Sequence, residues 1–550
     1  MKKLIPMILL AAAACLCAEQ QSQTGGPLEV RQSVRVQPLN ETVIPLRVGV
    51  VGQLNLTLPD VIKRVLANDP DIEVARINLQ EADYNITGAK GFYDPVFGVL
   101  AQHSRAVTPI ASIIGGSANG KLTNKEWDLN PSVTGSSPWL GGSYTMTFNN
   151  SQQITDSTFT TLNPQYPSSV SLNLTQPLWR GLHFDNGRYQ LQVARKNLGL
   201  SREQLRQQVI AVVTQAILDY WELDYAVHNL DVQVEAVRLA QQQYESNRRQ
   251  AEQGILAPID VVAAQTQVAT FQQGLFQAQQ ALTAAENNLK TLILTSQTDS
   301  IWGMALIPET EPDANVVPPT LSEATQQALN SRPELSENLI NLEVNRLTLK
   351  ETDEAAKPQV NAIATLTTTG LAGAGAPIQG FSIPGFNFAA PPLPPVLLGS
   401  YGQSLSNILG GNFTSAKVGV QISLPLHNRT AEANLAVSIA EKHRLEVLRN
   451  QLAMAIEADV RNSLQTLDSA RARYDAAMLA SRSAEEQYQS EQRQFQAGTS
   501  TVFLVLQRQT DLITARSREI RARADVAESV AGVDRATART MEAHQISVAP

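Results

Sequence analysis

The most regular pattern in the chain lies in residues 258–296, which read PIDVVAAQTQVATFQQGLFQAQQALTAAENNLKTLILTS. The apolar and small side chains recur at alternating steps of three and four, from Val261 through Phe271 and Leu282 to Leu292. A repeat of about 3.5 residues held over this length is typical of a helix in a left-handed coiled coil. We therefore predict a return helix over residues 258–296, packed along a second helix.

The partner of the return helix is a longer helix that directly precedes it in the chain. Residues 187–252 carry the same spacing and no proline, and residues 430–496 repeat this pattern before a second return helix over residues 502–540. At 1.5 Å per residue, each long helix would span about 100 Å. A shorter helical pattern opens each unit, and stacked end to end with a return helix it would match one long helix. The lengths predict a tall wall of long helices and stacked pairs.

The pattern occurs twice because the chain is a duplication. Thr57-Leu58-Pro59-Asp60 recurs as Thr320-Leu321-Ser322-Glu323, and Tyr244-Glu245-Ser246 recurs as Tyr488-Gln489-Ser490, in the same order. A fixed order of internal matches indicates two copies of one unit. The predicted divisions are a signal peptide (1–18), an N-terminal linker (19–53), repeat 1 (54–300), an inter-repeat linker (301–319), repeat 2 (320–540) and a C-terminal tail (541–550).

Between the leading and long helices, each repeat has a segment rich in Thr, Ser, Val and aromatic residues. We predict strands within residues 92–180 and within residues 359–425. Repeat 1 offers three candidates and repeat 2 offers two, and the sequence does not settle which are barrel strands. Residues 107–138 and 370–411 are rich in Gly, Pro and Asn, and we interpret them as exposed loops.

The N-terminus is typical of a secretory signal. Lys2 and Lys3 precede an apolar run to Ala14 that is too short to span a bilayer as a helix. Both cysteines, Cys15 and Cys17, lie in the predicted signal peptide, and the alternative to cleavage near residue 18 is lipid attachment at Cys15. After this segment, no run of 18 apolar residues predicts a transmembrane helix.

Composition and motifs argue against several functions. The net charge of −8 is not that of a nucleic-acid-binding protein. The six histidines show no metal-ligand spacing, and there is no phosphate-binding glycine loop and no GxSxG sequence. We therefore expect no enzyme activity, no cofactor and no metal site.

Together these features resemble the TolC-like outer-membrane factor family, the outer membrane efflux proteins. The resemblance covers about residues 54–540 and rests on the duplication, on Gln176-Pro177-Leu178-Trp179-Arg180-Gly181 and on the two hairpin tips. It implies a mainly α-helical chain with a membrane β-barrel, in which a homotrimer with four strands per protomer forms a 12-stranded barrel and an α-helical periplasmic tunnel. Four strands alone cannot close a barrel, and lipid tolerates no unpaired strand edge.

The resemblance also implies a function and its sites. The chain would be a passive exit duct of a tripartite efflux or type I secretion system, in outer-membrane lipid, with a periplasmic adaptor protein and an inner-membrane pump as partners. The implied adaptor-contact tips are Gly254, Ile255, Leu256, Ala257, Pro258, Gly498, Thr499, Ser500 and Thr501. The implied periplasmic mouth is Asp260, Phe503, Leu504 and Gln507, and the implied aromatic belt is Phe92, Tyr93 and Trp179.

Each site also has a plainer interpretation. Gly254 and Gly498 fit helix C-caps, Asp260 fits the first turn of a helix, and the aromatic residues fit ordinary packing. Ser500, Leu504 and Gln507 depart from the charged residues of the best-known member, which favours a mouth closed by hydrophobic side chains. For the whole chain the alternatives are a duct for proteins or metal ions, and a structural coiled-coil surface protein without channel activity.

Overall fold

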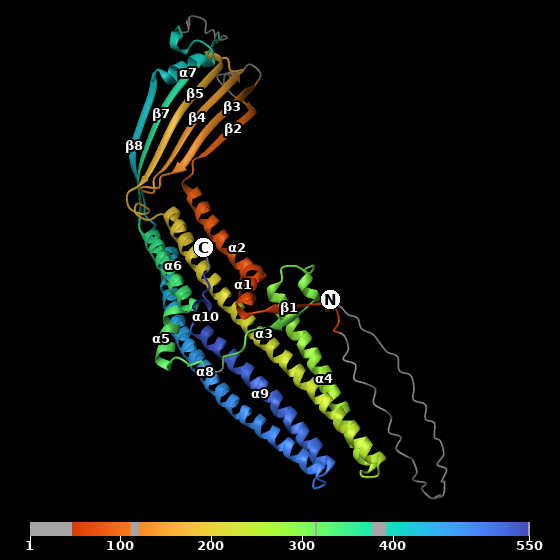
Figure 1. The fold of residues 1–550 in the computed structure, drawn as a ribbon. Coiled ribbons are helices and arrows are strands. Elements are labelled where there is room, and N and C mark those ends of the chain that lie inside the picture. Colours follow the sequence, from red (N-terminus) through yellow and green to blue (C-terminus); the bar gives the residue numbers. More distant parts are fainter. Residues whose placement is uncertain (1–46, 112–119, 314–315, 377–391, 548–550) are drawn as a thin grey trace, which may run out of the picture.

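A computed structural model describes residues 47–111, 120–313, 316–376 and 392–547 of the chain. A sheet lies at one end, and helices run from it to two hairpin tips at the other end (Figure 1). The predicted signal peptide, with Cys15, lies outside the described residues.

Each repeat contributes two leading helices, one long helix and one return helix. In repeat 1 these are α1 (Leu58–Asn68), α2 (Pro70–Lys90), α3 (Asn186–Glu252) and α4 (Pro258–Ile293). In repeat 2 they are α5 (Leu321–Ser331), α6 (Pro333–Ala356), α8 (Arg429–Gln496) and α9 (Val502–Ala536). The long helices have 67 and 68 residues, which corresponds to about 100 Å each.

The short helices stack along the long ones. α2 and then α4 pack against α3, α6 and then α9 pack against α8, and α3 also contacts α6 and α9. The wall is therefore four helices wide at most levels, in the order α2 or α4, α3, α6 or α9, and α8 (Figure 1). This is the alternation of long helices and stacked pairs that the helix lengths predict.

The heptad positions form the core of this wall. The regularly spaced residues of α4 before Leu292 are at most 6 % exposed: Val261, Ala264, Val268, Phe271, Leu275, Ala278, Leu282, Ala285 and Leu289. They pack against buried residues of α3 that include Val237 and Tyr244. Burial of one stripe along each helix holds the hairpin together, as in a coiled coil.

Two buried asparagines fix how α6 lies along α8. The Asn338 side-chain amide donates to the Leu445 carbonyl at 3.3 Å, and that of Asn345 donates to the Ser438 carbonyl at 3.2 Å. The donors are seven residues apart on one helix and the acceptors seven apart on the other, so both bonds report one antiparallel register. A buried polar group in an apolar seam specifies register in this way.

The sheet has six antiparallel strands, in the order β2-β3-β4-β5-β7-β8. The expectation of four strands per protomer is therefore wrong. Repeat 1 supplies four strands and repeat 2 supplies two: β2 (Val96–Pro109), β3 (Lys121–Ser136), β4 (Ser143–Thr155), β5 (Leu162–Pro177), β7 (Gln359–Gly375) and β8 (Phe413–Ser423).

The unexpected strand is β3, which lies in the stretch 107–138 that we interpreted as a loop. Its Asn, Pro and Gly residues favour loops locally, but pairing with β2 and β4 on both sides overrides that preference. The ladder to β4 is interrupted around Pro131, which has no N–H to donate. There the Asn150 N–H donates to the Asn130 side chain at 2.8 Å, and the Asn150 amide donates to the Leu129 carbonyl at 3.1 Å.

Two other stretches are more ordered than expected. The interval 370–411 contains the end of β7 and a helix, α7 (Tyr401–Leu409). The predicted inter-repeat linker contains β6 (Met304–Pro308), which pairs in parallel with β1 (Gly52–Leu56), a strand that begins at the end of the predicted N-terminal linker. The start of the chain's first repeat and the junction between the repeats are thus joined in one small sheet.

We predict that Gln509→Leu stabilises the protein. Gln509 of α9 is fully buried, and neither polar atom of its side chain has a hydrogen-bond partner. A buried unpaired amide costs about 1–3 kcal/mol, which leucine would remove. The urea-unfolding midpoint of the detergent-extracted protein should therefore rise. Gln507→Leu, at an exposed position on the same helix, serves as the control and should change little. A lower midpoint for Gln509→Leu would show that this amide has a partner.

Candidate functional site

The two hairpin tips close with the same backbone motif. After α3, the Ile255 N–H donates to the Gln250 carbonyl at 2.9 Å and the Gly254 N–H donates to the Ala251 carbonyl at 3.0 Å. After α8, the Thr499 and Gly498 N–H groups make the equivalent bonds to Gln494 and Phe495, both at 3.0 Å. This is the Schellman arrangement, which needs a left-handed residue after the helix. Gly254 and Gly498 supply it, with φ of +78° and +75°.

The tips present apolar side chains to solvent. Ile255 and Ile259 are 67 % and 68 % exposed at one tip, and Phe503 is 71 % exposed at the other. Leu504 is partly exposed and Gln507 is exposed, while Asp260 is half-buried in the first turn of α4. The structure thus places the implied mouth residues at the ends of α4 and α9. Each tip thus carries at least one exposed large apolar side chain, which suits a contact surface.

Polar contacts tie one hairpin to the other above the tips. The Gln267 amide of α4 donates to the Thr510 hydroxyl of α9 at 2.8 Å, and the Ser517 hydroxyl of α9 donates to Asn229 of α3 at 3.0 Å. Higher up, the Arg521 guanidinium of α9 bonds to Glu222 of α3. The heptad seams hold each hairpin internally, so these bonds are part of what joins the two hairpins to each other.

Arg521 is the centre of a charged cluster. Besides Glu222, its guanidinium bonds to Asp525 at 2.7 Å and to Glu528 at 3.0 Å, and it lies 5.0 Å from the centre of the Tyr225 ring. Burial raises the pKa of Glu528 to about 7, against the attraction of Arg521. The cluster therefore contains one carboxyl group that titrates near neutral pH. No sequence motif marks this cluster, because Glu222 and Tyr225 come from repeat 1 and Arg521, Asp525 and Glu528 from repeat 2.

The sheet has one apolar face. Residues paired across a sheet lie on the same face, so a row can be followed from strand to strand. One such row crosses all six strands, and its side chains are all apolar: Phe97, Val133, Met146, Leu172, Leu366 and Ala416. Phe97, Met146 and Leu366 are each close to half exposed or more. A sheet that exposes such rows requires an apolar environment on that side.

The other face of the sheet is polar. The adjacent row contains no large apolar side chain and reads Gly98, Ser132, Thr147, Ser171, Thr367 and Ser415. Further along this face, Gln102 donates to Asp128 at 2.8 Å and Gln153 donates to Glu126 at 2.7 Å. Alternation thus separates a lipid-compatible face from a mainly polar one, on which Val96 and Leu100 of β2 are exposed apolar exceptions.

Helix α7 covers the end of the apolar face that is farthest from the helical wall (Figure 1). Its Ser404 hydroxyl donates to Ser168 at 3.0 Å, and its Tyr401 hydroxyl donates to Asn150 at 2.6 Å. A Cβ at Gly370 would lie 2.1 Å from the Ser404 carbonyl oxygen, so glycine permits this close approach. Asn150, Ser168 and Gly370 are paired across β4, β5 and β7. Beneath α7 this face of the sheet therefore carries small and polar side chains in place of large apolar ones.

The implied aromatic-belt residues lie where the sheet meets the helices. Phe92 and Tyr93 form the short helix η1 (Gly91–Tyr93) between α2 and β2, and Trp179 follows β5. Phe92 also packs on the start of α3, since a Cβ at Gly187 would lie 2.3 Å from its ring. Trp179 is 54 % exposed. Phe92 therefore takes part in packing, and both Phe92 and Trp179 remain about half exposed.

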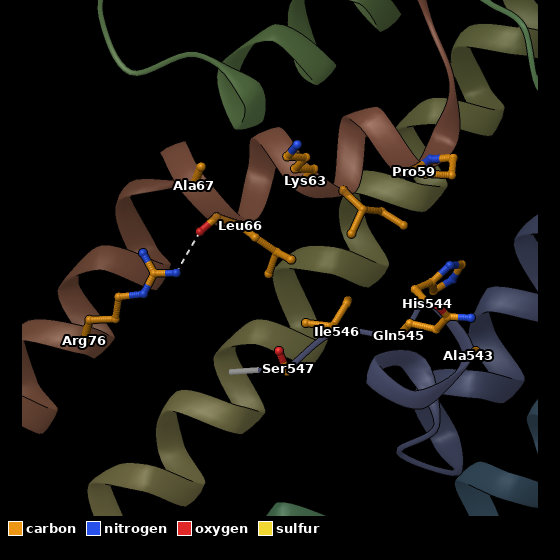
Figure 2. A pocket seen from close by; sticks show the side chains of 11 residues that line it. Pro59, Lys63, Leu66, Ala67, Arg76, Ala543, His544, Gln545, Ile546 and Ser547 are labelled. Carbon is orange, nitrogen blue, oxygen red and sulfur yellow. Dashed lines mark hydrogen bonds between the residues drawn. The ribbon is translucent and has the colours of Figure 1, made fainter. Parts of the chain in front are cut away.

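The described residues contain neither a membrane-crossing helix nor a group of three or more His, Cys, Asp or Glu residues able to hold a metal. One hollow of about 680 Å³ lies between α1, α2 and the C-terminal tail. Figure 2 shows Ile546 of the tail on the side of Leu66 of α1 and His544 on the side of Pro59. Burial lowers the pKa of His544, which favours its neutral form in this hollow. The contacts show how the tail docks on the wall.

A tall helical wall continuous with a sheet of one apolar and one polar face defines an outer-membrane channel protein. The model of the outer membrane efflux protein family matches residues 61–293 and 324–539. The chain belongs to this family, and its place is the outer membrane, with the helices extending into the periplasm. Members of the family are efflux ducts and not enzymes.

Solved structures of channels share this fold. CusC superposes with a TM-score of 0.62 at 16 % identity, over 87 % of this chain and 91 % of that chain. The CmeC outer membrane channel of Campylobacter jejuni gives 0.60 at 15 % identity, over 88 % and 86 %. The outer membrane protein VceC of Vibrio cholerae gives 0.59 at 14 % identity, over 87 % and 95 %. A comparison with the curated proteins found no match.

We predict that Gly498→Ala loosens its tip. A Cβ in the left-handed region costs roughly 1–2 kcal/mol, although nothing lies within 4 Å of it here. Hydrogen exchange of the amides around residue 498 should therefore become about 5–30-fold faster. Gly532→Ala, inside α9 with equal space but no positive φ, is the matched control and should not accelerate exchange. Unchanged exchange at the tip of Gly498→Ala would contradict the strain argument.

We predict that Glu528 makes stability fall as the pH rises. Its pKa is raised from the ordinary 4.5 to about 7, so the folded state binds its proton more tightly than the unfolded state does. The stabilisation is complete below pH 4.5 and is lost as the pH passes 7. The melting temperature of Glu528→Gln should therefore fall less between pH 5 and pH 8 than that of the wild type. Glu542→Gln, at an exposed carboxylate, should behave like the wild type.

Proposed function

We propose that three copies of this chain form a passive exit duct that carries substrates from an inner-membrane pump across the periplasm and the outer membrane. The duct would serve a tripartite efflux system or a type I secretion system, through a periplasmic adaptor protein. No chemical step is assigned to it. Transport follows from a continuous polar path, driven by the pump.

The two-faced sheet carries this proposal. Its apolar rows suit lipid, and its polar rows, such as Thr147, Ser171 and Thr367, suit a water-filled interior. One six-stranded sheet cannot enclose an interior, so several copies must share it. The helical wall below would then close into a tunnel of the same symmetry. A structural coiled-coil surface protein has no use for a sheet with one lipid-compatible face, so this alternative is disfavoured.

The lower end of the duct has two roles in the proposal. The exposed segments 254–258 and 498–501 are assigned to adaptor contact, since they lie at the ends of rigid hairpins and carry exposed apolar groups such as Ile255. Phe503 and Leu504, with Asp260 and Gln507, are assigned to the mouth. Phe503 and Leu504 lie in the first turn of α9, the first largely exposed and the second partly exposed, so in a ring of three copies they are free to meet near the axis.

The upper end has a boundary set by α7. The apolar rows end at Asn150, Ser168 and Gly370, where α7 covers the sheet. We assign the lipid band to the rows between this helix and the junction residues Phe92 and Trp179. The strands beyond the band, with α7, would then stand outside the membrane on the cell surface.

We predict that the protein conducts ions and that its mouth limits the current. Extracted trimers in a planar bilayer should give steady single-channel events, and Phe503→Ala or Leu504→Ala should raise the conductance several-fold because the narrowest side chains are shortened. Leu409→Ala, at an exposed position of α7, is the control and should leave the conductance unchanged. A native mass below that of a trimer, with no single-channel current from any variant, would contradict the proposed duct and favour the structural coiled-coil protein.

A further inference from the structure

The two outer strands of the sheet, β2 and β8, are each unpaired on one side. β2 pairs only with β3 and β8 only with β7 among the described strands. Nearly every residue of both strands is exposed, unlike those of the inner strands β4 and β5. A row of unpaired N–H and C=O groups in lipid costs several kcal/mol per group, so both edges require a partner.

The two edges are suited to each other in direction. All neighbouring strands of the sheet are antiparallel, and their number is even, so β2 and β8 run in opposite directions. β8 of one copy placed beside β2 of the next copy therefore continues the antiparallel order. No other strand of the sheet offers a free edge to either of them.

The faces also match across such a seam. Phe97 and Val99 of β2 and Val418 and Val420 of β8 lie on the apolar face and are more than half exposed. Pairing β2 with β8 so that these residues share a face would continue the lipid-compatible surface without a polar gap. A register that differs by one residue would turn them toward the polar interior. The alternation of side chains therefore excludes every second register of the β8–β2 pairing.

The helices support the same head-to-tail contact. Figure 1 shows β8 and α8 on one side of the protomer, and β2, α2 and α4 on the other. α8 exposes Val437, Met454 and Leu479, and the opposite side exposes Ile77 of α2 and Phe276 of α4. One rotation that joins β8 to β2 would also bring these apolar helix faces together. Both parts of the chain would be covered by a single heterologous contact that closes into a ring.

The circumference of the helical tunnel can be compared with that of the barrel, with three copies taken from the proposed trimer. Three copies of a wall four helices wide give twelve helices, which at 8–10 Å between axes enclose a circumference of about 95–120 Å. Three copies of six strands give eighteen, which at about 4.8 Å and a tilt near 40° enclose about 110 Å. Twelve strands would enclose only about 75 Å. Eighteen strands therefore meet the tunnel without a taper.

We infer that the partner of the β2 and β8 edges is a second copy of this chain, and that the trimer closes an eighteen-stranded barrel through three β8–β2 seams. The inference rests on the proposed trimeric duct. It makes the barrel backbone about 36 Å across, against about 24 Å for twelve strands. The duct would then keep nearly its full width through the outer membrane, and the tips would be its narrow part.

Cysteine cross-linking in the outer membrane tests the seam. Val420→Cys on β8 is combined in turn with Phe97→Cys, Val99→Cys or Ala101→Cys, at three successive positions of β2 on the apolar face. Oxidation with a membrane-permeant reagent should convert most of the chain of at least one pair into covalent trimers, because paired strands bring Cα atoms within disulfide range. Each single cysteine variant is the control for non-specific cross-linking.

A matched pair distinguishes the alternative barrel. If the β2–β3 hairpin stood outside the barrel, β8 would pair with β4, and Met146→Cys with Val420→Cys would give the covalent trimer instead. A covalent trimer through Met146 would overturn the eighteen-stranded barrel and leave the duct intact. The same holds if the native mass is that of a trimer and none of the β2 positions gives a cross-link. A chain of monomeric native mass overturns the proposed duct itself, and this inference with it.

Discussion

Lipid offers no hydrogen-bond partner to a peptide group, and the sheet of this protein can be understood from that constraint. Its six strands satisfy one another internally and leave only the outer sides of β2 and β8 open. The chain therefore cannot be complete as a monomer in a membrane. The apolar rows and the need for a strand partner at each open edge both follow from the same requirement.

The helical part obeys a different rule, because it lies in water. Each hairpin is held by a continuous apolar stripe, as the buried positions of α4 show, whereas polar bonds help to hold the two hairpins to each other. Apolar seams lose much free energy when they separate, and polar bonds exposed to water can be exchanged for bonds to water at small net cost. Ile513, Ala527 and Ala531 of α9 also belong to apolar clusters with α3, so the contact between the hairpins combines apolar packing with polar bonds such as that of Arg521 to Glu222.

Sequence reasoning succeeded where the pattern was long and repeated. The structure ends α3 at Glu252 and α8 at Gln496, and the left-handed glycines follow at Gly254 and Gly498. It failed at β3, because Asn, Pro and Gly in a stretch that pairs on both sides look locally like a loop. The charged cluster at Arg521 was also invisible, since α3 and α9 are about 300 residues apart in the chain. The roles of Asp260, Phe503 and the tip residues rest on the family and remain proposals.

The sequence by itself determined the duplication, the heptad seams, the lengths of the long helices and the caps at their tips. These depend on hydrogen bonds to residues four positions away and on side chains three or four positions apart, so the information is local. Only the tertiary structure decided the number of strands, their order, and which side chains form the apolar and polar faces. A strand finds its partners far along the chain, and the side chains of one face share nothing in sequence but alternation, so pairing alone reveals them.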